Sequence, residues 1–333
     1  MLLRYFAKRL VFMVVVFLII SVLIFAIYQM VPGDPVLRFM NPEERQLPEA
    51  AFQVIYDQIR DRLGLDQPIY TQYIRWIGNM VRGDFGISMQ AQAPVIDVIR
   101  GPIFVTLQMN LMVMVIVFLV AVPLGITTAI KKGSIYDNTA QTITLFGFSI
   151  PLFITAILAV FVFALWLDLT PVSGFGDPMF PVENPDPTRW EIFMDRLPFM
   201  ILPVGVLSFG SLAGLARITR ATMIDAMSQD YIRTARAKGL REGAVIYSHA
   251  FRNSMIPFVT SLVGWLIGLL SGTLILEQIF GIQGMGRAFI GAIIALDYNL
   301  ALAIQTIFTV MILIGYIIVD IAYVLVDPRV RLD

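Results

Sequence analysis

The densest group of residues that could act chemically lies at positions 230–257, in the stretch DYIRTARAKGLREGAVIYSHAFRNSMIP. It holds five Lys and Arg residues and the only histidine of the chain, His249, and it lies between two strongly apolar segments. Gly239 divides it into two parts. Basic side chains in such a loop could dock another protein, or they could only mark the cytoplasmic side of a membrane protein.

The remaining residue types exclude most enzyme chemistry. The chain has no cysteine, which excludes thiol catalysis, disulfides and thiolate metal sites. Its single histidine excludes a HExxH or other multi-histidine metal site. None of its lysines follows a glycine, as the phosphate-binding Walker A pattern requires, and no G-x-S-x-G occurs. We therefore expect no catalytic, metal or cofactor site in this chain.

One enzyme alternative deserves a separate test, because the segments YD at 136–137 and GFGD at 174–177 resemble those of intramembrane aspartyl proteases. Their two aspartates must meet inside the membrane. We expect Asp177 in an outer loop and Asp137 in a cytoplasmic one, so an intramembrane enzyme stays a remote alternative.

Composition predicts a polytopic membrane protein. The chain has 333 residues, of which 58% are hydrophobic and 14% charged, and its mean hydropathy is +0.79. Soluble domains have about 25% charged residues. The formal net charge is zero, so no overall field attracts nucleic acid.

Six apolar segments have about the 20 residues that a membrane-spanning helix needs. The first has basic residues before it, like a signal peptide, but it lacks a small-residue cleavage site and is interpreted as a retained helix. The predicted spans are 11–31, 103–130, 139–167, 197–215, 257–279 and 300–326.

The distribution of basic residues predicts that both termini lie in the cytoplasm. With the N-terminus inside, the inner segments hold 14 of the 24 Lys and Arg residues and the two short outer loops hold three. The long segment 32–100 counts little in this rule, although it holds the other seven.

The predicted organisation is therefore all-α, with three parts. Residues 1–31 form the N-terminus and first span, 32–100 an extracytoplasmic helical insertion, and 101–333 a five-helix core with a cytoplasmic loop at about 216–256. The insertion has apolar residues at helical spacing, with Gly64 as a C-cap. It could be a cap that buries its own apolar faces, or a docking platform or lid over the outer mouth.

Polar residues inside spans are candidates for function, because they are costly in a membrane. They could line a wet path, or they could only pack and pair between helices. In particular, Asp320 could pair with an arginine on the cytoplasmic side. Too few carboxylates are present for a proton relay. The candidates for path or intersubunit residues are Gln108, Asn110, Ser149, Glu277, Gln305 and Asp320.

The basic loop has the pattern of two short helices. QDYIRTARAK is a plausible helix that ends at Gly239, and LREGAVIYSHAFRN resumes helical spacing. Small side chains, among them Ala235 and Ala237, would let this rigid protrusion enter a groove of a partner.

The loop resembles the EAA motif of ABC importer permeases, whose helix–Gly–helix enters the cytoplasmic ATPase. Ala235 matches the second alanine of the motif, and Gly239 matches its glycine. Arg233 and Thr234 depart from the general pattern, as does Phe251-Arg252, but IRTARAKGL is typical of the dipeptide/oligopeptide subfamily. The stretches PGDPV, ARITRATM, LEQIFGIQGMGRAFIGAIIALDY and IAYVLVDPRVR also resemble this subfamily.

The resemblance implies the B-type permease subunit of a peptide importer with the type I ABC importer permease fold, in a bacterial or archaeal inner membrane. It implies as partners a homologous second permease, two cytoplasmic ATPase subunits that carry ATP and Mg, and an external solute-binding lipoprotein. Oligosaccharides, nickel chelates, opines or glutathione remain alternative solutes. The residues it implies for ATPase coupling are Arg233, Ala235, Arg236, Ala237, Lys238, Gly239 and Leu240.

Overall fold

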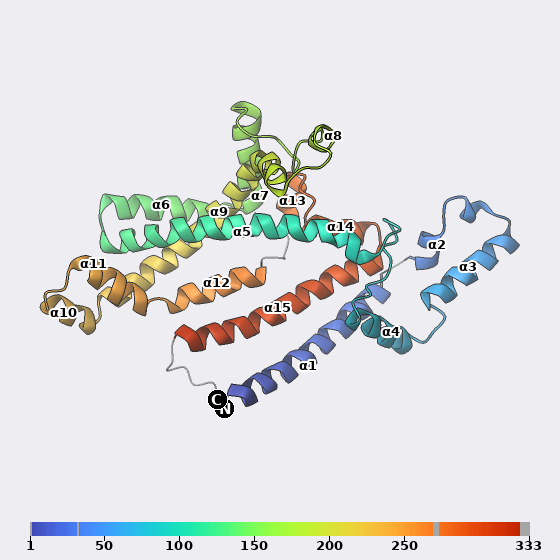
Figure 1. Ribbon diagram of the computed structural model, residues 1–333, viewed down its shortest axis with the longest axis horizontal. Helices are drawn as coiled ribbons and strands as arrows, with labels where there is room; N and C mark the ends of the chain where they lie inside the picture. Colours follow the sequence, from blue (N-terminus) through green and yellow to red (C-terminus); the bar gives the residue numbers. More distant parts are fainter. Residues whose placement is uncertain (1, 32, 269–272, 327–333) are drawn as a thin grey trace.

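Four long helices lie along the length of the molecule (Figure 1). The computed structural model describes residues 2–31, 33–268 and 273–326. Within these residues the structure is helical, apart from turns and one isolated bridge between Ile87 and Pro94. The long helices are α1 (Leu2–Gln29), α5 (Val95–Ile130), α9 (Arg189–Met227) and α15 (Tyr298–Val326), each long and apolar enough to cross a membrane.

The third predicted span is broken at a proline. α6 (Ile135–Ser149) and α7 (Leu152–Ala159), which continues as a π-helix over Val160–Trp166, meet at an angle of 97°. Pro151 has no N–H and disfavours a helical conformation of the residue before it, and Ile150 is indeed extended. By length and composition, the described residues thus contain four spans, or five if this bent pair counts as one.

The fifth predicted span also differs from a continuous helix. α12 (Ile256–Gly268) has only 13 residues, and α13 (Leu274–Ile279) has six. Residues 269–272, which include the polar Ser271, lie outside the described part of the chain. A run of apolar residues predicts that a segment can lie inside a membrane. It does not predict that the segment forms one continuous, straight helix. The count of six spans is therefore not confirmed.

The insertion between α1 and α5 is helical, as predicted, and lies at the end of α1 away from the N-terminus (Figure 1). It contains α2 (Pro35–Phe39), a 3-10 turn (Glu44–Gln46), α3 (Glu49–Leu63) and α4 (Ile69–Val81). Gly64 ends α3 with φ +68°, which confirms the predicted C-cap.

The insertion does not bury all of its apolar side chains. α4 rests on α1, where Tyr73 bonds Ser21 at 2.8 Å and contacts the ring of Phe25. On another face of α4, however, Ile74 and Val81 are 65% and 77% exposed. The interpretation of the insertion as a cap that buries its own apolar faces is therefore wrong for this face.

Asp297 joins two segments at the end of the molecule near the insertion. The carboxylate of buried Asp297 accepts hydrogen bonds from the Ser88 hydroxyl and the Gln90 N–H, and it caps α15 through the Leu300 N–H. The segment that leads into α5 is thus tied to the start of α15. α14 (Met285–Ile294) packs between them, and α8 (Phe180–Glu183) belongs to the loop before α9.

α9 is the longest helix, with 39 residues. It begins with a capping box, in which the Thr188 hydroxyl and the Glu191 side chain each bond the backbone of the other residue. It packs mainly along α5, and buried apolar residues of the two helices make up most of the largest hydrophobic cluster among the described residues. α9 therefore connects the loop that contains α8 to the basic loop at 230–257 as one element.

Candidate functional site

The basic loop forms a helical protrusion at the end of the molecule opposite the insertion (Figure 1). α10 (Asp230–Ala237) follows the end of α9 after two residues. After a tight turn come α11 (Glu242–Ala244) and a π-helix over Val245–Phe251. The predicted pair of short helices separated by Gly239 is confirmed.

Gly239 makes the break between the two helices. Its φ is +75°, in the left-handed region that favours glycine. The Gly239 N–H donates to the Arg236 carbonyl at 2.9 Å, and the Leu240 N–H donates to the Ala235 carbonyl at 3.4 Å. This pair of hydrogen bonds is a Schellman motif, which satisfies the last carbonyls of α10. A Cβ at Gly239 would meet no atom within 4 Å, so the requirement for glycine within this chain is conformational.

The inner face of α10 packs on the rest of the chain. Ile232 and Ala235 are three residues apart and so share one face of the helix. They are buried against a cluster that includes Met223, Val245 and Ala250. Ala235 is only 5% exposed, so the expectation that it joins Ala237 in an outward small face is wrong. Its small size instead lets α10 approach the following helix closely.

The solvent-exposed face of the protrusion carries most of the predicted coupling residues. These side chains are exposed: Arg233, Arg236, Ala237, Lys238 and Leu240. They are not all free positive charges, since Arg236 Nη2 lies 2.6 Å from Glu242 Oε1. The hydrogen bond from Arg236 lowers the pKa of the Glu242 carboxyl. Arg233 likewise lies 3.3 Å from Asp230, three residues earlier in the helix.

These acidic partners were missed by reasoning from the sequence. The Asp230–Arg233 pair could have been found from its i, i+3 spacing. The Arg236–Glu242 pair spans the turn at Gly239, so it depends on the turn geometry. Together the two pairs leave the protrusion less positive than its count of basic residues indicates.

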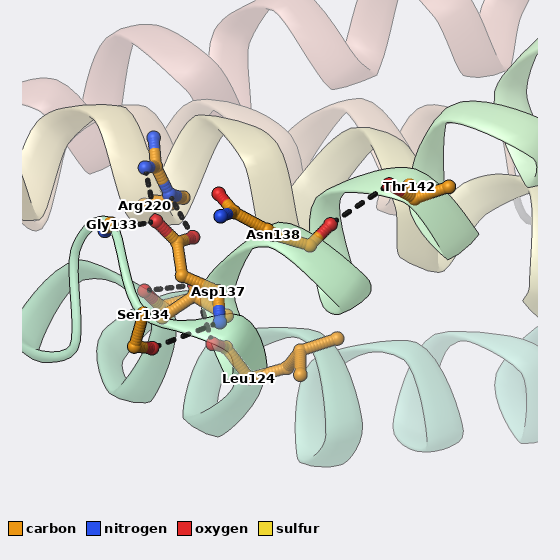
Figure 2. Close-up of polar contacts among 9 residues, drawn as sticks. Leu124, Gly133, Ser134, Asp137, Asn138, Thr142 and Arg220 are labelled. Carbon is orange, nitrogen blue, oxygen red and sulfur yellow. Dashed lines mark hydrogen bonds and ion pairs between the residues drawn. The ribbon is translucent and has the colours of Figure 1, made fainter.

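A buried ion pair anchors α9 just before the protrusion. Figure 2 shows Arg220 of α9 against the carboxylate of Asp137 of α6, with both contacts at 2.7 Å. Asp137 is 1% exposed and also accepts the Gly133 N–H at 2.9 Å. A paired geometry of this kind is the strongest that arginine makes with a carboxylate. Asp137, the protease candidate, is thus engaged by Arg220 and not by Asp177.

Two of the six candidate path residues line cavities. Asn110 lines one of about 530 Å³ between α5, α9 and α12, and Ser149 lines one of about 390 Å³ at the bend between α6 and α7. Leu207 and Ser211 of α9 belong to both cavities. Ser211 was missed by reasoning from the sequence, although its place in the small-residue stretch GSLAG is a signal for an open helix face.

Of the other four candidates, three make contacts within the described chain. Asp320 lies 2.6 Å from Arg9 of α1, so it pairs with an arginine of the same chain. Glu277 is fully buried and accepts hydrogen bonds from the Arg287 N–H at 2.7 Å and the Thr106 hydroxyl at 3.3 Å, so it caps the start of α14. Gln108 contacts the Met200 sulfur at 3.5 Å, and Gln305 of α15 lines neither cavity.

Long apolar helices define the class of this protein as a polytopic membrane protein, which carries a helical protrusion at one end. Comparison with known proteins gives the family. Residues 121–332 match the family described as "Binding-protein-dependent transport system inner membrane component", and residues 2–110 match the family of the N-terminal part of such components. The chain belongs to this family. It is a multi-pass membrane component of a transport system and not an enzyme.

Curated relatives match over almost the whole chain. It is 35% identical to the "Dipeptide transport system permease protein DppB" of Escherichia coli (strain K12), with 99% of each chain covered. It is 34% identical to the "Oligopeptide transport system permease protein AppB" of Bacillus subtilis (strain 168), with 98% and 99% covered. It is also 34% identical to the "Glutathione transport system permease protein GsiC" of Escherichia coli O1:K1 / APEC, with 99% of each covered.

Among solved structures, a chain from inward-facing conformations of the MetNI methionine ABC transporter is similar, with a TM-score of 0.49 and 16% sequence identity. The match covers 70% of the present chain and 97% of that chain.

Proposed function

We propose that this chain is the permease subunit of an ATP-driven, binding-protein-dependent importer of di- and oligopeptides. The observation that carries the proposal is the protrusion from α9, in which a Schellman turn at Gly239 joins two short helices at the end away from the insertion. A rigid, exposed element of this form is suited to enter a groove of a cytoplasmic partner. The names of the relatives, which are a dipeptide and an oligopeptide permease, supply the class of solute.

The proposed topology has six spans with both termini in the cytoplasm. The four long helices and the bent pair α6–α7 would supply five spans, and α12 with α13 would supply the sixth as a broken span. In this arrangement the insertion is extracytoplasmic and the protrusion cytoplasmic. The fold would be that of type I ABC importer permeases, with 101–333 as the core.

The proposed partners follow from the family. A homologous second permease would complete the solute path. Two cytoplasmic ATPases would bind ATP and Mg, and an external solute-binding lipoprotein would deliver the solute. The coupling residues would be those exposed around Gly239, with Ala235 supporting the protrusion from its buried side.

Glutathione, itself a small peptide, is the second candidate solute, because the relative named for its transport is almost as similar as those named for peptides.

The test is uptake and association in the native host. Cells that lack this chain should lose uptake of a labelled dipeptide, and the restored, affinity-tagged chain should recover uptake and co-purify with ATPase subunits. Uptake that persists without the chain, or a purified chain without ATPases, would contradict the proposal. Competition by excess glutathione against the labelled dipeptide distinguishes the two candidate solutes.

A further inference from the structure

Among the residues that the structure describes, the walls of the two adjoining cavities around Ser211 contain no charged residue. We call them together the Ser211 groove, which consists of the cavity of about 530 Å³ and the cavity of about 390 Å³ that share Leu207 and Ser211. Their polar side chains are neutral: Asn110, Ser149, Thr155, Ser211, Ser261 and Thr273. Each volume falls in the range of about 300–1,000 Å³ that is usual for small-molecule sites.

Some glycines in the wall of the groove face space that no other atom of this chain fills. A Cβ added at Gly214 of α9, or at Gly264 or Gly268 of α12, would meet no atom within 4 Å. Gly147, which lines the smaller cavity, is different: a Cβ there would lie 3.1 Å from the ring of Phe209, so that glycine is needed for packing. Because glycine is less favourable than alanine inside a helix, open glycines facing one cavity indicate that the space itself is used.

The polar groups of the groove fit an amide-bearing solute. Asn110 is 8% exposed and still borders the larger cavity, and the Thr273 hydroxyl, which also borders it, is buried without a hydrogen-bond partner in the described structure. Serine, threonine and asparagine can donate to and accept from peptide groups, whatever side chains the peptide carries.

We propose that the Ser211 groove is the solute path of this chain and that it discriminates passing peptides by bulk and not by charge. The proposal rests on the proposed function, because it assumes that peptides are the cargo. The absence of charged groups in the walls means that no ion pair can form with an acidic or basic side chain. The glycines without neighbouring atoms determine how wide the Ser211 groove is, and so how large a peptide side chain can pass.

The first test is solvent access, which does not depend on the identity of the solute. In a chain without cysteine, Ser211→Cys introduces the only thiol and changes one atom. In the membrane-embedded transport complex, we expect a small hydrophilic thiol reagent to label Ser211→Cys and a pre-bound bulky group there to stop uptake. Ser208→Cys, three residues earlier on α9 and buried outside both cavities, is the matched control and should stay unlabelled. Equal labelling of both, or of neither, would overturn the proposal.

The second test separates bulk from charge. Gly214→Leu should lower uptake of Trp-Trp at least tenfold relative to Ala-Ala, while the ratio of Ala-Glu to the nearly isosteric Ala-Gln stays as in the wild type. Gly205→Leu is the control, because Gly205 is an equally open glycine of α9 outside both cavities. If Gly214→Leu lowered uptake of all four peptides equally and the second permease were also lost from the complex, the groove would be a contact surface between subunits. That result would refute the proposal that the groove is the solute path. Unchanged ratios would refute it as well. A wild-type chain that imports none of these peptides would instead contradict the proposed function, and the labelling test would still decide the groove.

Discussion

Replacement of Gly239 should uncouple the protrusion from the ATPase without unfolding the membrane part. Residue 239 has φ +75°, and an ordinary L-residue in this conformation costs about 1–2 kcal/mol. That free energy shifts the balance between the native turn and other turns by about 5- to 30-fold. Since a Cβ at 239 meets no atom within 4 Å in this chain, Gly239→Ala should weaken docking by up to that factor. Gly239→Val should weaken it more, because its branched Cβ clashes with its own backbone.

The substitutions form a series with its own controls. Gly239→Asn should have the smallest effect, because asparagine tolerates the left-handed region. Gly243→Ala, four residues later in α11, is the matched control, since Gly243 is equally open but has no positive φ. Lys238→Glu should weaken docking only slightly, as exposed charges usually contribute less than about 1 kcal/mol. Arg236→Glu should do more harm than Lys238→Glu, because it places a second carboxylate beside Glu242.

The assay is reconstitution of the whole transport complex, with two measurements: the amount of ATPase bound and the solute-stimulated ATP hydrolysis. We expect both to fall in the order Asn, Ala, Val at position 239, while Gly243→Ala stays at the wild-type level. Normal assembly and normal stimulated hydrolysis in Gly239→Val would mean that the loop only marks the cytoplasmic side. If Gly243→Ala lowered ATPase binding and stimulated hydrolysis as much as Gly239→Ala, the absence of a side chain would be what matters in this loop. The left-handed backbone conformation of residue 239 would then not be the cause.

Three other predictions test the anchoring, the topology and the selectivity. Asp137→Asn should destabilise the chain by about 3–5 kcal/mol, because it leaves a largely buried Arg220 unpaired, and Asp137→Asn/Arg220→Gln should recover part of the loss in thermal unfolding; a single variant as stable as the wild type would contradict this. In intact cells, an impermeant maleimide should label Gln53→Cys but not Ser228→Cys, and the reverse result would refute the topology. Exchange of the external binding protein for a related one of different preference should change which peptides enter, and an unchanged preference would place selectivity in the permease.

Local signals in the sequence were sufficient for the helix ends. Gly64 and Gly239 each follow a helical pattern, and each adopts the left-handed conformation that ends a helix. Both predictions depend only on neighbouring residues. The same holds for the helical character of the insertion, where apolar residues recur at helical spacing in α3 and α4.

Features set by tertiary contact could not be predicted. The direction of Ala235 depends on how α10 lies against the following helix, which its own small size does not reveal. Arg220 and Asp137 are 83 residues apart, and the sequence has several arginines that could serve as the partner. Glu277 shows the same limit, because its role as a cap for α14 requires the chain to turn back between 277 and 287.

Because α9 is one continuous helix, a small tilt at one point would produce a larger displacement at its far end. Between Pro203 and Met227 this helix has no proline, and its residues from Ser211 to Ser228 span about 26 Å at 1.5 Å per residue. A tilt of about 10° that pivots at Ser211 would therefore move the cytoplasmic end by about 4–5 Å. The Arg220–Asp137 pair ties the start of α6 to that swing, so a push on the protrusion would move α6 together with the cytoplasmic end of α9.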